Sequence, residues 1–292
     1  MARILRLFIF VGILGLAAFF YLTRPVGVDP DDFANLVGDP SHGTQVFHAA
    51  GCASCHAAPK TDFSDHPILS GGQKFPSPFG TFNAPNISPD PQNGIGGWTL
   101  LEFANAVQAG VSPDGAHYYP AFPYTAYAKM RPQDVADLKS FMDALPISYS
   151  PSLPHDVGFP FNIRRTLGGW KLLFANSDWV LTNAESPEIE RGRYLVEALA
   201  HCGECHTPRN ALGGLKRGDW LQGAFIPGEG KVPAIASGQL DWAPSDIAYY
   251  LETGFTPEFD SAGGAMTHVV ENMGQLSASD RESIAAYLKL IP

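Results

Sequence analysis

The four cysteines of this 292-residue chain fall in two pairs, and a histidine directly follows each pair. The motifs read CASCH, from Cys52 to His56, and CGECH, from Cys202 to His206. Two thiols one helical turn apart can each form a thioether with a vinyl group of a haem, and the adjacent imidazole then reaches the iron. The spacing therefore predicts two covalently bound haem c groups, attached through Cys52, Cys55, Cys202 and Cys205 and ligated by His56 and His206.

Three other functions of paired cysteines, namely zinc binding, dithiol redox chemistry and structural disulfides, explain this pattern less completely than haem attachment does. A zinc ribbon places its two pairs about 15–20 residues apart, whereas these pairs lie in opposite halves of the chain. A thioredoxin-like dithiol needs a strand–helix context and gives no reason for the two histidines. Structural disulfides suit an exported chain, but they leave the histidines unexplained as well. Haem attachment explains both the cysteines and the histidines.

The second axial ligand of each iron decides what a haem can do, and a methionine there raises the reduction potential. The chain has five methionines. Met1 belongs to the N-terminal segment, and Met142 falls inside a predicted amphipathic helix, where a core position is expected. Three candidates remain, namely Met130, Met266 and Met273.

In the first half of the chain the candidate is Met130, which lies in an irregular stretch just before a predicted helix; His117 is a weaker rival. In the second half, spacing counted from Trp242 favours Met273 over Met266, but one gap reverses that choice, and His268 is a minor candidate. If methionine ligates both irons, neither iron keeps an open position. That favours electron transfer over peroxide or oxygen chemistry.

An apolar N-terminal segment runs unbroken from Leu7 to Leu22, between Arg6 and Arg24. It is slightly longer than the core of a usual secretory signal and just short of the roughly 17–25 residues of a spanning helix. No small-x-small cleavage site follows it, so we expect an uncleaved membrane anchor over residues 1–25; a cleaved signal peptide is the alternative. The positive-inside rule keeps the N-terminus in the cytoplasm and exports the remainder.

The exported part contains two related units, because helix signals recur in the same order after each cysteine motif. In each unit we expect one helix to carry the cysteines near its C-terminal end, a second to follow a tryptophan and end at Gly110 or Gly254, and a third to close the unit. No run of alternating polarity predicts a strand. The expected fold is all-α, with units at 26–147 and 189–292 joined by a connector at 148–188.

Within the connector, a helical pattern over residues 162–174 places Ile163, Leu167, Trp170 and Phe174 on one face. Arg164, Arg165 and Lys171 lie off that face. The segment could contact an anionic membrane surface or a partner protein. The simpler interpretation is a helix that fills the crevice between the two haem units.

Composition and charge narrow the function further. The chain contains 30 glycines and 25 prolines but only 16% charged residues, which indicates many loops. Its apolar fraction of 45% excludes global disorder. A formal net charge of −10 lacks the basic face that phosphate neutralisation requires. Nucleic acid is therefore not an expected partner.

Beyond the cysteine motifs, three phrases are distinctive: NISPDPQNGIGGWTLLEF, GVSPDGAHYYPAFPY and HCGECHTPRNALGG, with GGAMTHVV near the end of the chain. With these the chain resembles the membrane-anchored dihaem cytochrome c subunits of periplasmic alcohol, aldehyde and sugar dehydrogenases. The resemblance implies a class I cytochrome c fold in each unit. It also implies that Met266, in the phrase G-x-M-x-x-V-V, is the second axial ligand of the second haem. Many relatives carry methionine where this chain has Phe122, so Met130 is left to serve the first.

The resemblance further implies an electron-transfer protein rather than an enzyme, anchored in the bacterial inner membrane with its haem units in the periplasm. Its electron donor would be a dehydrogenase, and its acceptor an oxidase, quinone or another cytochrome of the respiratory chain. The alternative is a dihaem enzyme of the thiosulfate dehydrogenase or peroxidase type, in which one iron would be open or differently ligated.

Overall fold

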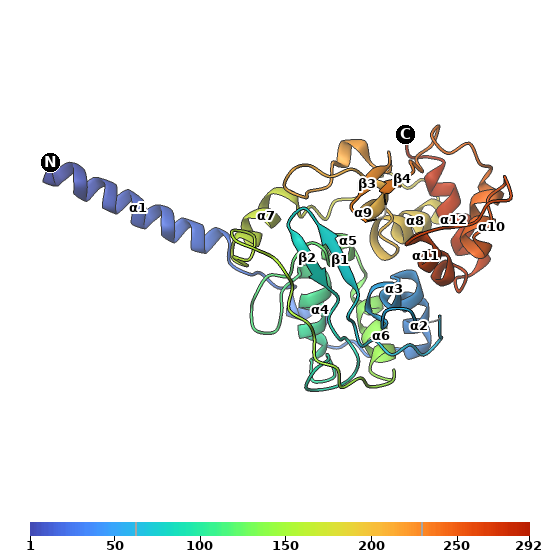
Figure 1. Ribbon diagram of the computed structural model, residues 1–292, viewed down its shortest axis with the longest axis horizontal. Helices are drawn as coiled ribbons and strands as arrows, with labels where there is room; N and C mark the ends of the chain where they lie inside the picture. The colour runs from blue at the N-terminus through green and yellow to red at the C-terminus, as the bar shows by residue number, and fades with distance from the viewer. Residues whose placement is uncertain (62, 229) are drawn as a thin grey trace.

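A single long helix, α1 (Ala2–Leu22), projects away from the rest of the molecule in the computed structural model, which describes all residues except 62 and 229 (Figure 1). The helix has 21 residues, more than the apolar run, because residues on the N-terminal side of that run continue it. None of its residues is buried. At 1.5 Å per residue it is about 30 Å long, which matches the hydrocarbon thickness of a bilayer. It is long and apolar enough to cross a membrane, although a signal sequence has the same properties.

Two sets of elements follow in the same order, as the internal repeat predicted, and helices dominate both. The first unit comprises α2 (Pro40–Ala49), α3 (Cys52–His56), the hairpin β1–β2 (Lys74–Ser77, Gly80–Asn83), α4 (Leu100–Ala109), α5 (Tyr124–Tyr127) and α6 (Pro132–Met142). The second comprises α8 (Pro187–Tyr194) with a π-helical turn (Leu195–Leu199), α9 (Gly203–His206), β3–β4 (Ala224–Ile226, Gly230–Val232), α10 (Pro244–Thr253), α11 (Met266–Met273) and α12 (Ala278–Leu288). Outside these sets lie α7 (Thr166–Phe174) and the 3-10 turns Pro30–Asp32 and Arg217–Asp219.

Local side chains and glycines fix the helix ends, and the ends at Gly110 and Gly254 are those that the sequence predicts. Thr99 caps α4 through a reciprocal pair of hydrogen bonds with Glu102, and the Ser277 hydroxyl accepts the Asp280 amide at the start of α12. Gly110 ends α4 and Gly254 ends α10, with φ of 59° and 77°. Glycine adopts this left-handed conformation without steric cost, so each helix stops there.

In each unit the first and last helices pack closely against one another, α2 on α6 and α8 on α12. Glycine makes this close approach possible. A Cβ on Gly43 would lie 2.0 Å from the Asp137 carbonyl oxygen, and one on Gly192 would lie 2.0 Å from that of Ser283. Large apolar side chains from both helix pairs, such as Phe47 and Ile284, are buried in the core.

The cysteines do not lie on the preceding helix, as the sequence suggested, but on separate short helices, α3 and α9, with Cys202 as the N-cap residue of α9. The break before α3 is Gly51, with φ of 60°, and the equivalent break before α9 is His201, with φ of 42°. Left-handed backbone at one residue redirects the chain, so each cysteine motif turns away from the long helix before it. The two hairpins were also not predicted, because strands of three or four residues are too short to show alternation.

Candidate functional site

The two cysteine motifs form equivalent sites, each on its own short helix. Cys52 and Cys202 are half-buried, whereas Cys55 and Cys205 are exposed. Burial raises the pKa of the Cys52 and Cys202 thiols to about 12, so both thiols are protonated at neutral pH. A catalytic dithiol requires the opposite shift, toward thiolate. The electrostatics of the motifs therefore argue against a thioredoxin-like function.

A proline carbonyl orients each motif histidine. His56 Nδ1 lies 2.9 Å from the Pro85 carbonyl oxygen, and His206 Nδ1 lies 2.8 Å from that of Pro233. Placing the proton on Nδ1, which faces the carbonyl, leaves Nε2 with a lone pair for a metal ion. Burial lowers the pKa of both imidazoles and favours their neutral, ligating form.

The loop that carries each proline carbonyl is held by the same backbone bonds in both units. The amides of Gly71 and Gly223 each donate to the motif histidine's carbonyl oxygen at 2.7 Å. Beyond the hairpins, the amides of Ile87 and Ile235 each donate at 2.9 Å, to Leu69 and Leu221.

Sequence reasoning missed the two prolines as functional residues. The signal was present, since each unit has Pro-x-Ile after its hairpin, at Pro85 and at Pro233. The role of each proline depends on the hairpin before it, which brings the proline carbonyl next to the motif histidine.

The candidate sulfur ligands occupy different surroundings. Met266 is the first residue of α11 and is half-buried against the core, whereas Met273, at the other end of α11, is buried within it. Met130 is also buried, one position before the cap of α6. The residue at the equivalent place before α12 is Leu276, so Met130 stands at a position where the other unit has a core leucine.

The histidine rivals are engaged elsewhere. His117 Nε2 donates to the Thr23 carbonyl oxygen at 2.9 Å, near the end of α1. His268 Nδ1 pairs with the Glu271 carboxylate at 2.9 Å on the exposed side of α11. Neither imidazole is directed by its described contacts toward a cysteine motif.

The two motifs lie close together at the boundary between the units. Residues next to the two motifs are linked through a single side chain, that of Tyr127. Between the motifs the Tyr127 ring stacks on His201, with centroids 5.4 Å apart, and the Tyr127 hydroxyl donates to the Ala50 carbonyl oxygen at 2.9 Å. The left-handed His201 thus supplies an aromatic contact where the first unit has only Gly51.

The donor set fits covalent haem in both units. Each short helix presents two thiols one turn apart, and the adjacent imidazole has its Nδ1 fixed and its Nε2 available. Cys52, Cys55 and His56 would hold one haem, and Cys202, Cys205 and His206 the other.

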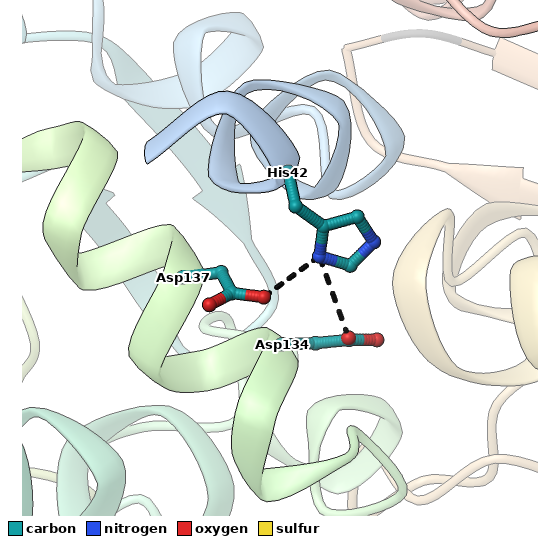
Figure 2. Close-up of side chains that lie close together, drawn as sticks. All are labelled: His42, Asp134 and Asp137. Atoms are coloured by element: carbon teal, nitrogen blue, oxygen red, sulfur yellow. Dashed lines mark hydrogen bonds and ion pairs between the residues drawn. The ribbon is translucent and has the colours of Figure 1, made fainter. Parts of the chain in front are cut away.

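One further cluster of potential ligands has a structural explanation. Figure 2 shows His42 directed at two carboxylates of α6, with Nδ1 2.7 Å from Asp137 Oδ2 and 3.8 Å from Asp134 Oδ1. The remaining oxygens already accept hydrogen bonds, because Asp137 Oδ1 takes the Asp39 amide at 2.7 Å and Asp134 Oδ2 takes the Tyr194 hydroxyl. The cluster therefore joins α2 to α6, and through Tyr194 it joins the first unit to the second.

Comparison with known proteins gives consistent matches. A family model described as cytochrome c matches residues 41–146. A protein of Cereibacter sphaeroides named "Diheme cytochrome c-type" is 55% identical over 277 residues, 94% of each chain. The fructose dehydrogenase cytochrome subunit of Gluconobacter japonicus is 37% identical over 86% of this chain, and the cytochrome c subunit of the quinone alcohol dehydrogenase of Gluconobacter oxydans is 33% identical over 86%. The chain spans about half the length of these two subunits, 52% and 54%.

Proposed function

Since the chain belongs to the dihaem c-type cytochromes, which transfer electrons, we propose that it is a membrane-anchored carrier that takes electrons from a dehydrogenase and delivers them to the respiratory chain. The observation that supports this proposal is the pair of equivalent cysteine motifs near the boundary between the units, where Tyr127 contacts the residues preceding both motifs. A haem iron that alternates between ferric and ferrous states accepts and releases one electron at a time. Two such groups close together in one chain suit transfer between a donor and an acceptor.

The proposed partners follow from the names of the relatives. Several are cytochrome subunits of dehydrogenases that act on fructose, alcohol or gluconate. A periplasmic dehydrogenase is therefore the proposed donor, and an oxidase, a quinone or another cytochrome the proposed acceptor. The relatives that support this are electron-carrying subunits, so a thiosulfate dehydrogenase or peroxidase function has no support among them.

We also propose that α1 stays attached and anchors the chain in the bacterial inner membrane, with the haem units in the periplasm. The contacts at its end support this. Thr23 is buried, its carbonyl oxygen accepts the His117 Nε2 hydrogen bond, and its hydroxyl accepts a hydrogen bond from Arg165 Nε at 3.0 Å. Cleavage near Val26 would remove a residue that the folded body uses.

For the second axial ligands we propose Met130 and Met266. The segment before Met130 crosses the first motif, since the Tyr127 hydroxyl bonds Ala50 just before Cys52, and the Met130 amide bonds the Tyr127 carbonyl oxygen at 2.9 Å. Met266 is more accessible than Met273 and begins its helix, so it can turn toward a haem without opening the core.

Leucine substitution of the methionines tests this ligand set and the carrier function together. In the oxidised holoprotein, Met130→Leu and Met266→Leu should each remove about half of the near-infrared band that reports sulfur bound to ferric iron, and each should create one high-spin haem. Met273→Leu, which removes from the core a thioether as buried as that of Met130, should leave the band intact. Loss of the band in Met273→Leu but not in Met266→Leu would reverse the assignment. An unchanged band in Met130→Leu would return that residue to the core role of Leu276.

A further inference from the structure

Five large apolar side chains are exposed on α7 and in the loop that precedes it, and we refer to them as the α7 surface. Leu172 and Leu173, on α7, are 64% and 70% exposed, and Phe159 in the preceding loop is 80% exposed. Phe161 and Ile163 complete the set. A soluble chain does not normally leave such a group of large apolar side chains in water without a partner.

Apart from Ile163, the α7 surface does not coincide with the apolar face that the sequence identified. Trp170 and Phe174, which belong to that predicted face, pack on the second unit: Trp170 Nε1 donates to the Leu212 carbonyl oxygen at 2.9 Å, and Phe174 lies where a Cβ on Gly214 would be. Leu167 is buried as well. Leu167, Trp170 and Phe174 of the predicted face therefore pack against the protein, while Leu172 and Leu173 are exposed.

The α7 surface is fixed to the end of α1. Arg165 Nε donates to the Thr23 hydroxyl at 3.0 Å, and its guanidinium carbon lies 5.4 Å from the centre of the Phe20 ring. A Cβ on Gly168 would lie 2.4 Å from the Thr23 carbonyl oxygen, so the backbones of α7 and α1 touch. Figure 1 shows α7 at the inner end of α1. These contacts place α7 at the level where α1 leaves the apolar part of a bilayer.

Two basic side chains of this region, Arg164 and Lys171, are turned into the protein. Arg164 Nη1 donates to the His117 carbonyl oxygen at 2.8 Å, and Lys171 Nζ donates to the carbonyl oxygens of Ala109 and Gly110 at 2.6 and 2.8 Å. Their cationic groups are occupied within the first unit. What α7 itself presents outward, at the end of α1, is therefore Leu172 and Leu173 rather than Arg164 or Lys171.

We propose that the α7 surface lies in the lipid–water interface of the membrane that α1 spans, as the apolar side of an interfacial helix does. The inference rests on the anchor of the proposed function, because it is the continuity with α1 that identifies lipid as the occupant. The consequence is a fixed orientation of the haem units relative to the membrane. Two rigidly connected contacts, α1 and the α7 surface, hold the haem units at a set angle close to the bilayer instead of on a free tether.

The test uses single cysteines introduced into the full-length holoprotein in lipid nanodiscs. The four native cysteines are committed to haem attachment, so an added thiol is the one that reacts with a membrane-impermeant maleimide. Leu172→Cys and Leu173→Cys should react at least tenfold more slowly than Phe225→Cys and Phe259→Cys, which replace side chains 76% and 97% exposed in the second unit. Haem content of each variant confirms that it has folded.

Ile13→Cys, in the middle of α1, separates failure of this inference from failure of the anchor. If Ile13→Cys is protected and Leu173→Cys reacts as fast as Phe259→Cys, the α7 surface is in water and the inference is wrong. If Ile13→Cys also reacts fast, the anchor itself is wrong. Protection of Leu173→Cys that disappears on dilution at constant lipid content would identify a second copy of the chain as the occupant and would also overturn the inference.

Discussion

Replacing Cys202 and Cys205 together by alanine is expected to halve the covalently bound haem, from two groups per chain to one. Alanine removes both thioether positions of α9 but leaves α3 and its orienting contact with Pro85 intact. The first unit has its own paired helices, α2 and α6, and its own core, so it should still mature. The measurement is the haem-to-protein ratio after acid–acetone extraction, together with the mass of the intact chain.

Two matched comparisons make this result specific. Cys52→Ala with Cys55→Ala should also leave one haem, this time on the second unit. Glu204→Ala and Ser54→Ala alter residues between the cysteines without removing a thiol and should retain two. A chain that kept two covalent haems after loss of either cysteine pair would show that the motifs are not the attachment sites.

Gly192→Ala is expected to lower the free energy of unfolding by about 2–3 kcal/mol, as forced overpacking of a close contact does. The new Cβ would lie 2.0 Å from the Ser283 carbonyl oxygen and 2.9 Å from the Tyr287 Cβ, so α8 and α12 would have to separate. That separation also disturbs the Tyr287 hydroxyl, which donates to the buried Glu197 carboxylate at 2.7 Å. Guanidinium unfolding of the holoprotein, followed by haem absorbance, measures the change.

Gly218→Ala is the control, because nothing lies within 4 Å of a Cβ at that position. Its effect should stay within about 0.5 kcal/mol, as for most surface changes. Gly43→Ala should resemble Gly192→Ala, since its Cβ would meet the Asp137 carbonyl oxygen at 2.0 Å. If Gly192→Ala and Gly218→Ala unfold alike, the two helices do not need glycine at their contact.

Features that depend on local chemistry could be predicted from the sequence. The left-handed Gly110 and Gly254 end their helices through backbone groups a few residues away, so a short window of sequence contains the whole interaction. The cysteine motifs are local for the same reason. The helical class and the duplicated order of elements followed from these signals.

Features that depend on distant contacts could not be predicted. The proline carbonyls that orient His56 and His206 come from loops more than twenty residues further along the chain, and a hairpin too short to show periodicity positions each loop. Nothing in the sequence around His201 indicates a left-handed backbone. The structure shows that His201 has this conformation at the position equivalent to Gly51 in the first unit. The exposure of Leu172 and Leu173 likewise depends on which side of α7 the second unit covers.

The central claim is that this chain carries electrons on two covalently bound haems whose irons keep both axial positions closed. The most direct test is a reductive titration of the purified full-length holoprotein, followed by exposure of the reduced protein to carbon monoxide. The account predicts uptake of two electrons per chain and an absorption spectrum that carbon monoxide leaves unchanged. A carbon monoxide complex at one haem per chain would reveal an open iron and contradict the account.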